Sequence, residues 1–295
     1  MPSRPSAAHW VAGARPRTLP AAVVPVALGT GVAVGVGEAV WWRALLALVV
    51  SLALQVGVNY ANDYSDGVRG TDEVRVGPIR LVGQRLAAPT SVKTAAFTAF
   101  AVAGVLGLAL IVLSGLWVML PIGALAILAA WYYTGGRRPY GYLGLGEVFV
   151  FVFFGLVATL GTMATMATVT AAGWWGAIGV GSVTSAILVA NNLRDIPTDS
   201  VTGKRTLAVR LGDKRTRAFY VALIALAFVM TALAALTSAY ALLALLAAPL
   251  IARPIRDVAS GATGRDLIPT LAGTGVFELV WAALLAIGLA LGYHF

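Results

Sequence analysis

The sequence of 295 residues contains no cysteine and only two histidines, and charged residues make up just 11% of it. The missing cysteines exclude disulfide bonds, thiolate metal sites and a cysteine nucleophile. His9 and His294 lie near the two ends of the chain, far in sequence from every other polar motif, so they do not suggest a metal site. A P-loop, a dinucleotide-binding fingerprint and a serine nucleophile elbow are also missing. Any catalysis must therefore use Asp, Glu, Asn, Arg, Lys or Tyr side chains.

Apolar residues are abundant instead: they make up 59% of the chain, and the mean hydropathy is +0.87. A soluble domain has about 45–50% apolar and about 25% charged residues. The composition therefore predicts an integral membrane protein. A bundle of spanning helices uses this length as one unit, so we expect a single domain over residues 1–295. The first apolar segment begins only after Arg15-Pro16-Arg17 and leads into further segments, so we expect it to stay as a helix and not to be cleaved as a signal.

The apolar windows of spanning length number nine, and they predict an all-α polytopic membrane protein with nine transmembrane helices. They fall at about residues 20–37, 41–62, 92–114, 117–133, 143–166, 172–193, 216–236, 239–256 and 270–292.

Basic residues test this division independently. With nine helices, 20 of the 21 Lys and Arg residues fall on one side, and Arg43 is the exception. By the positive-inside rule that side is cytoplasmic, which places the N-terminus inside and the C-terminus outside. The net charge of +9 does not indicate a nucleic-acid partner, because the basic residues are scattered among short loops.

Two acidic blocks interrupt the apolar sequence, each where a long apolar segment ends. The first is Asn62-Asp63-Tyr64-Ser65-Asp66, with Asp72 beyond it, and the second is Asn191-Asn192-Leu193-Arg194-Asp195, with Asp199 beyond it. Carboxylates at the ends of membrane helices are costly unless something positive lies between them. Oxygen donors without His or Cys favour Mg²⁺, which completes its coordination with water and substrate phosphates. The blocks therefore predict a magnesium and diphosphate site on the cytoplasmic side.

Residues four apart share a helix face, so Asn62 with Asp66, and Asn191 with Asp195 and Asp199, would point into a common cavity if the helices extend through them. Pro197 argues against a regular helix through Asp199. We expect the connections 63–91 and 194–215 to be functional caps. Basic residues beside the acidic blocks could neutralise diphosphate oxygens; these are Arg80, Arg137, Arg138, Lys204 and Arg205.

Some of these residues have a simpler interpretation. Asp and Arg at the ends of membrane helices also serve as interfacial anchors, although that does not explain the joint pattern. Glu147 and Glu278 lie inside apolar stretches and are either functional carboxylates or neutralised structural groups. Tyr132 and Tyr133 either line a cavity or belong to an interfacial aromatic belt.

These motifs resemble the UbiA superfamily of membrane prenyltransferases, which has an Asn-Asp-x-x-Asp motif after the second helix and an Asp-x-x-x-Asp motif after the sixth. Asn62, Asp66, Asp195 and Asp199 match this pattern. The stretches Gly77-Pro78-Ile79-Arg80, Tyr133 to Tyr142 and Gly144-Leu145-Gly146-Glu147 are most similar to the branch that prenylates 1,4-dihydroxy-2-naphthoate in menaquinone synthesis.

Two departures from the family pattern concern the site. The third acid of the first motif would fall at Gly70, whereas the next carboxylate here is Asp72. The Tyr-x-x-x-Lys motif of the family reads Tyr133-x-x-x-Arg137, which keeps the charge but replaces an ammonium with a planar fork. We expect Arg137 still to contact the diphosphate.

The resemblance implies a UbiA-type bundle in a bacterial cytoplasmic membrane. The bundle would use Mg²⁺ to transfer a polyprenyl group from polyprenyl diphosphate to 1,4-dihydroxy-2-naphthoate, with loss of the carboxylate. It implies catalytic roles for Asp66, Asp195, Asp199, Tyr133 and Arg137. It implies substrate binding by Asn62, Arg80, Arg138, Asn191, Lys204, Arg205 and Glu147. The implied metal ligands are Asn62, Asp63, Asp66, Asp72, Asp195 and Asp199.

Two alternatives stay open. One is a UbiA-type enzyme for another aromatic acceptor, such as 4-hydroxybenzoate. The other is a secondary transporter of an anion, which would place its acidic groups near the middle of the membrane and not at one face.

Overall fold

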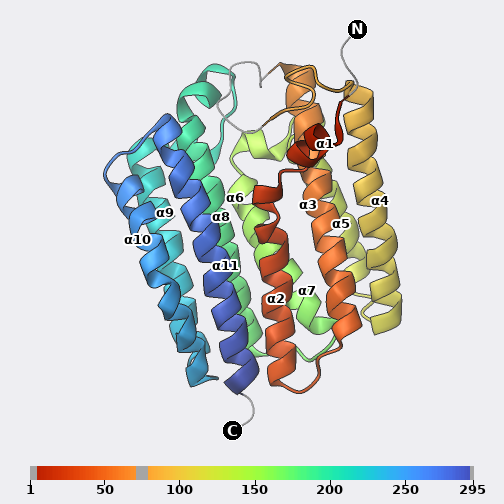
Figure 1. Cartoon of the computed structure of the whole chain (residues 1–295), viewed down its shortest axis with the longest axis vertical. Coiled ribbons are helices and arrows are strands. Elements are labelled where there is room, and N and C mark those ends of the chain that lie inside the picture. The colour runs from red at the N-terminus through yellow and green to blue at the C-terminus, as the bar shows by residue number, and fades with distance from the viewer. Residues whose placement is uncertain (1–4, 71–78, 293–295) are drawn as a thin grey trace.

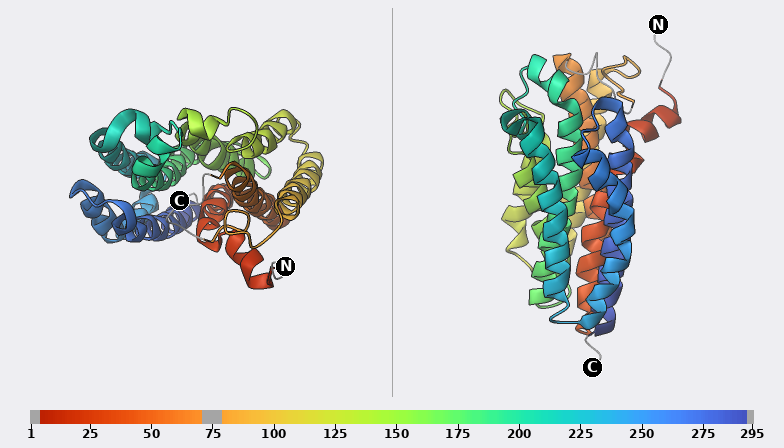
Figure 2. Two further views of the ribbon diagram at one scale, coloured as in Figure 1. Left: turned by 90° about the horizontal axis from the view of Figure 1, so that it is seen from above. Right: turned by 90° about the vertical axis from the view of Figure 1, so that its left-hand side faces the viewer.

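The computed structural model describes residues 5–70 and 79–292. These residues form long helices that run side by side, with the C-terminal end of the described chain at the opposite end of the bundle from α1 (Figure 1; Figure 2). The helices of the first half are α1 (Ala7–Gly13), η1 (Pro16–Thr18), α2 (Pro20–Gly35), α3 (Trp41–Arg69), α4 (Pro89–Ser114) and α5 (Met119–Tyr132). Those of the second half are η2 (Tyr140–Leu143), α6 (Gly146–Val150), the π-helical η3 (Phe151–Val157), α7 (Ala158–Ala164), α8 (Ala171–Val201), α9 (Leu207–Ala234), η4 (Ala239–Ala247), α10 (Ala248–Ala259), η5 (Gly264–Leu267) and α11 (Ile268–Leu291).

The described part of the chain is helical without strands, as predicted, and each of the nine predicted ranges contains helix. Six of these helical stretches are long and apolar enough to cross a membrane, or seven when α1 and η1 are joined to α2 across a 50° bend. The helix α5 is apolar but has only 14 residues. The count of nine spans therefore stays a prediction.

Both predicted cap connections are shorter than expected. The helix α3 continues to Arg69 and ends where Gly70 adopts a φ of 74°, so most of the first acidic block is helical. The helix α8 continues to Val201, through Pro197, and α9 begins at Leu207. The expectation that Pro197 argues against a regular helix through Asp199 was wrong. Apolar windows locate only the part of a helix that faces lipid. The helices continue beyond it, where Asp63, Asp66, Asp195 and Asp199 are buried against protein.

The larger core cluster joins α2, α8, α9, α10 and α11 around fully buried large side chains such as Tyr220, Phe277 and Trp281. A smaller cluster joins α3 and α4 to the connection at residues 79–88, and it includes Tyr60 and Leu81. Helix backbones also approach closely: a Cβ added at Gly155 in η3 would lie 2.5 Å from the Cα atom of Gly181 in α8. Small residues at such crossings are typical of helix packing in membranes.

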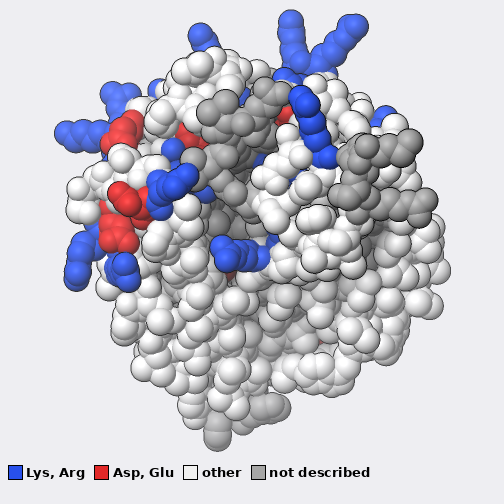
Figure 3. All heavy atoms as spheres, turned by 45° about the horizontal axis from the view of Figure 1, so that its top comes forward, with Lys and Arg blue, Asp and Glu red and all other residues white. Residues whose placement is uncertain are grey.

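Charged side chains gather at one end of the molecule, whereas the surface further along the helices is almost free of them in the same view (Figure 3). The first turn of α3 lies at the other end (Figure 1), and it carries Arg43, whose guanidinium donates to the carbonyls of Leu113 and Thr165. The basic exception to the charge pattern therefore ties the ends of α4 and α7 together.

Candidate active site

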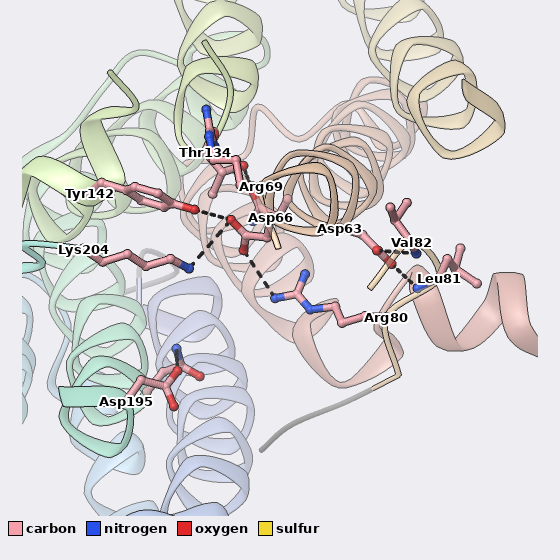
Figure 4. A network of polar contacts seen from close by, with 12 residues as sticks. Asp63, Asp66, Arg69, Arg80, Leu81, Val82, Thr134, Tyr142, Asp195 and Lys204 are labelled. Atoms are coloured by element: carbon pink, nitrogen blue, oxygen red, sulfur yellow. Dashed lines mark hydrogen bonds and ion pairs between the residues drawn. The ribbon is translucent and has the colours of Figure 1, made fainter. Parts of the chain in front are cut away.

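Asp66 lies in the last turns of α3, where three other segments meet it. Its Oδ1 atom accepts a hydrogen bond from the Tyr142 hydroxyl at 2.5 Å. Its two oxygens also lie 3.7 Å from the Lys204 Nζ atom and 3.7 Å from a guanidinium nitrogen of Arg80 (Figure 4). Asp66, Arg80 and Lys204 are all buried, with exposed fractions of 3%, 6% and 8%. The Asp66 carboxylate thus lies near two buried cations, Arg80 and Lys204.

Tyr142 connects these charges. Its ring lies under the Lys204 Nζ atom at 4.7 Å and under the Arg69 guanidinium carbon at 5.4 Å. Both cations are attracted to the face of the ring. Arg69 also donates to the carbonyls of Thr134 and Gly136, which ties the end of α3 to the segment after α5.

The side-chain amide of Asn62, one turn before Asp66, faces the segment after α5. Its Oδ1 atom accepts from the Thr134 hydroxyl at 2.8 Å, and the side chain is buried. Asn62 and Asp66 therefore share a helix face, as the four-residue spacing predicted.

Asp63 is also buried, but it contacts a different segment. Its Oδ2 and Oδ1 atoms accept hydrogen bonds from the backbone N–H groups of Leu81 at 2.7 Å and Val82 at 3.0 Å (Figure 4). The metal role predicted for Asp63 thus competes with two backbone contacts.

In the second acidic block, Asp195 contacts side chains of its own helix. Asp195 on α8 forms a two-pronged pair with Arg194, whose Nε and Nη2 atoms lie 2.7 and 2.8 Å from the two carboxylate oxygens. The same guanidinium donates to the Asn191 Oδ1 atom at 2.9 Å. Figure 4 shows Asp195 on a separate helix from the Asp66 network. Asp199, one turn further on, is buried, and its carbonyl accepts from the Lys204 N–H at 3.0 Å.

Glu147 lies in the first turn of α6 and faces α8. Its Oε1 atom accepts from the Asn192 amide at 2.9 Å, while its Oε2 atom is buried without a hydrogen bond in the described structure. Glu278 in α11 is fully buried, and one of its oxygens accepts from the Thr184 hydroxyl of α8.

The other predicted residues lie around the same connection. Tyr133 packs edge to face on Tyr140 at 5.5 Å, and burial raises the pKa of the Tyr140 hydroxyl. Arg137 and Arg138 are exposed. The side chain of Arg205 is exposed too, but its N–H donates to the Tyr142 carbonyl at 3.0 Å. Asp72 lies outside the described residues.

Arg69, Tyr142 and Arg194 contact the predicted site residues but were not among them. Tyr142 ends the stretch from Tyr133 to Tyr142 that supported the resemblance, so its motif was visible although its role was not. Arg69 comes three residues after Asp66, and Arg194 directly precedes Asp195. Sequence alone does not show in which direction these side chains point.

A magnesium ion is compatible with this donor set. Within residues 5–70 and 79–292, no group of three or more His, Cys, Asp or Glu side chains lies close enough to hold a metal alone. Magnesium needs no such cage, because it commonly takes one or two carboxylates and completes its coordination with water and substrate phosphate oxygens. The carboxylates of Asp66, Asp195 and Asp199 and the amide oxygens of Asn62 and Asn191 supply ligands of this hard oxygen type.

Comparison with protein families decides the family. The model of the UbiA prenyltransferase family matches residues 22–266. The chain belongs to the UbiA prenyltransferase family. This UbiA chain is 56% identical to the 1,4-dihydroxy-2-naphthoate octaprenyltransferase of Mycobacterium tuberculosis, over 97% of this chain and 98% of that protein. It is 38% identical to the Escherichia coli protein of the same name, over 84% of each chain.

Solved structures show the UbiA fold at lower identity. A UbiA homologue from Archaeoglobus fulgidus bound to GPP and Mg²⁺ matches with a TM-score of 0.67 and 15% identity, over 94% of this chain and 99% of that one. The apo structure of a UbiA homologue from Aeropyrum pernix K1 matches with a TM-score of 0.70 and 15% identity, over 90% of this chain and 96% of that one.

Proposed function

We propose that this protein transfers a polyprenyl group from polyprenyl diphosphate to 1,4-dihydroxy-2-naphthoate, with loss of the carboxylate, to give demethylmenaquinol. The observation that carries the proposal is the buried cluster of Arg80, Lys204 and Asp66, which combines cations for an anionic diphosphate with a carboxylate for its metal ion. The choice of acceptor is supported by relatives at 54–56% identity over 97% of this chain that bear the name 1,4-dihydroxy-2-naphthoate octaprenyltransferase. It agrees with the resemblance of the motifs to the branch that prenylates 1,4-dihydroxy-2-naphthoate.

The diphosphate would be bound by basic side chains. Arg80 and Lys204 are already desolvated, so they need not lose a hydration shell when they contact its oxygens. Three further basic residues are exposed: Arg137 and Arg138, in the connection that also carries Tyr142, and Arg205, which follows Lys204. We propose that they contact the outer oxygens of the diphosphate. Asn62, Asp66, Asp195 and Asp199 would hold Mg²⁺, with Asp72 as a further candidate, and Asn191 would contact the substrate. When bound, the ion would supply charge neutralisation for the diphosphate leaving group.

The reaction needs no protein nucleophile. The positive groups stabilise the charge that develops on the diphosphate as its bond to the allylic carbon breaks. The electron-rich ring of the acceptor then attacks the allylic cation, and carbon dioxide leaves from the ring. Tyr133 offers a ring face that could stabilise this cation, whereas the ring of Tyr142 already serves two protein cations. Glu147 is the buried carboxylate that we assign to the acceptor side of the site.

We also propose a topology. The described helices would make nine membrane spans as one domain, with the N-terminus and the active site on the cytoplasmic side of a bacterial membrane. The gathering of charges at one end supports this orientation through the positive-inside rule (Figure 3).

The deciding experiment uses purified protein in lipid nanodiscs, supplied with polyprenyl diphosphate and 1,4-dihydroxy-2-naphthoate. Mass spectrometry should find the prenylated, decarboxylated naphthoquinol with Mg²⁺ and lose it when a chelator is added. Product from 4-hydroxybenzoate but none from the naphthoate would discard the acceptor and keep the chemistry. If no acceptor yields product while the protein moves an anion across liposomes, the transporter alternative replaces the enzyme.

A further inference from the structure

The carboxylate of Asp63 holds a turn of the chain that follows α3 in sequence. Both of its oxygens accept backbone hydrogen bonds, from Leu81 at 2.7 Å and from Val82 at 3.0 Å, and its side chain is fully buried. Hydrogen bonds to an ionised acceptor are stronger than those between neutral groups. Asp63 therefore fixes two successive peptide groups against α3.

The segment that it holds is a compact turn. The Leu81 carbonyl accepts from the N–H groups of Leu86 at 2.8 Å and Ala87 at 3.0 Å, and the Arg80 carbonyl accepts from Gln84 at 3.0 Å. Arg85 adopts the left-handed conformation, with a φ of 57°. Such backbone geometry persists only where surrounding contacts impose it. We call residues 80–87 the Arg80 turn.

Close packing holds the Arg80 turn from two sides. One turn after Asp63, a Cβ added at Gly67 would lie 2.5 Å from the Cβ atom of Val82. On the other side, a Cβ added at Gly13 of α1 would lie 2.7 Å from a methyl carbon of the buried Leu81. The turn has no room to shift toward either helix.

Arg80 directly precedes the two peptides that Asp63 holds, and its guanidinium lies 3.7 Å from Asp66. Asp63 and Asp66 are three residues apart on α3, so one helix carries both the carboxylate that faces the active site and the carboxylate that places the cation beside it. We propose that Asp63 is a positioning residue for Arg80 and acts on diphosphate binding through the backbone of the Arg80 turn, not as a magnesium ligand. This proposal rests on the proposed function of the Asp66 site.

The substitution Asp63→Asn separates the two roles. An amide has one acceptor oxygen, so its nitrogen would face one of the two backbone N–H groups as a second donor. The turn should loosen, and we expect diphosphate binding to weaken about tenfold, as for the loss of one charge-assisted hydrogen bond.

The test is a double-mutant cycle on purified protein in nanodiscs, with inorganic diphosphate and Mg²⁺ as the probe and isothermal titration calorimetry as the measurement. The variants are Asp63→Asn, Arg80→Met and the double variant. If Asp63 acts through Arg80, the double variant binds diphosphate no more weakly than Arg80→Met alone. A further loss in the Arg80→Met background, or a higher Mg²⁺ requirement for Asp63→Asn at saturating diphosphate, would overturn the proposal in favour of a metal role.

A second substitution perturbs the Arg80 turn without changing a carboxylate. Gly67→Ala should push Val82 away from α3 and weaken diphosphate binding in the same way, with no further loss when it is combined with Arg80→Met. Gly123→Ala in α5 is the matched control, because a Cβ there meets no atom within 4 Å, and its diphosphate affinity should equal that of the wild type. Unchanged affinity in Gly67→Ala, with an unaltered thermal midpoint, would contradict the proposal.

The proposed function fails in a different way. Wild-type protein that binds no magnesium diphosphate would overturn the function before any variant is made. If the wild-type protein binds diphosphate but does not prenylate the naphthoate, the proposed acceptor is wrong. The double-mutant cycle still tests the role of Asp63, because it measures only diphosphate binding.

Discussion

The two acidic blocks balance their charge in opposite ways. Asp66 at the end of α3 meets Arg80, Tyr142 and Lys204, which come from three different connections. Asp195 on α8 is balanced by Arg194, the residue directly before it, and by Asn191 one turn earlier. Asp66 therefore contacts side chains of three other segments, whereas Asp195 pairs with neighbours on its own helix; in the same block, Asn192 reaches Glu147 of α6. Changes around Asp66 should alter substrate binding, and changes around Asp195 should first alter the helix.

The largest expected effect comes from removing either carboxylate. Asp66→Ala and Asp195→Ala should each lower turnover by at least about 10³-fold, because the site would lose charge stabilisation where the leaving group departs. Mass-spectrometric assay of prenylated naphthoquinol measures this loss. Size-exclusion profiles and thermal midpoints serve as the folding control. Near-normal turnover in either folded variant would refute the magnesium and diphosphate site.

Removing one cation beside Asp195 and one beside Asp66 tests whether the two carboxylates depend on their partners in different ways. Arg194→Met should leave Asp195 buried without its two-pronged partner and destabilise the protein by about 3–5 kcal/mol. Lys204→Met leaves Asp66 with Tyr142 and Arg80, so we expect little loss of stability but weaker diphosphate binding. Thermal unfolding in detergent and calorimetric diphosphate binding separate the two outcomes. Equal destabilisation by both variants would contradict the contrast.

Tyr142→Phe removes one contact to Asp66 and keeps the ring that Lys204 and Arg69 contact. We expect a fall of about tenfold in kcat/KM for the prenyl diphosphate, which corresponds to one hydrogen bond to a charged group. Steady-state kinetics at saturating naphthoate measure it. Tyr142→Leu, which also removes the ring, should cost more; if the two variants behave alike, the ring contributes nothing to placing the cations.

The smallest effect should come from Arg137→Ala, because its side chain is exposed. We expect a rise of about threefold or less in KM for the prenyl diphosphate at physiological ionic strength, and almost none at about 1 M salt, where exposed charges are screened. The paired variant Arg80→Ala should show a larger rise that persists in salt, since Arg80 is buried. An effect of Arg137→Ala as large as that of Arg80→Ala would show that Arg137 turns inward when substrate binds.

The sequence predicted the helical class and the helical ranges because lipid imposes long apolar segments, and these are visible in composition. It also brought Asn62 and Asp66 to one helix face through their spacing. It did not predict that α3 and α8 continue through their acidic blocks, since that depends on partners elsewhere in the chain, such as Thr134 for Asn62. The backbone contacts of Asp63 could not be predicted for the same reason. In the sequence, a carboxylate that accepts backbone hydrogen bonds cannot be distinguished from one that binds a metal.

The gathering of charged residues at one end of an otherwise apolar bundle bears on how products leave. In the proposed reaction, one substrate pair yields a highly charged diphosphate and a prenylated quinol that scarcely dissolves in water. A reaction centre at the boundary lets each product partition by solubility alone, the diphosphate into the aqueous phase and the quinol along the helices into the bilayer. Position in the membrane would thus give the enzyme separate exits for its two products.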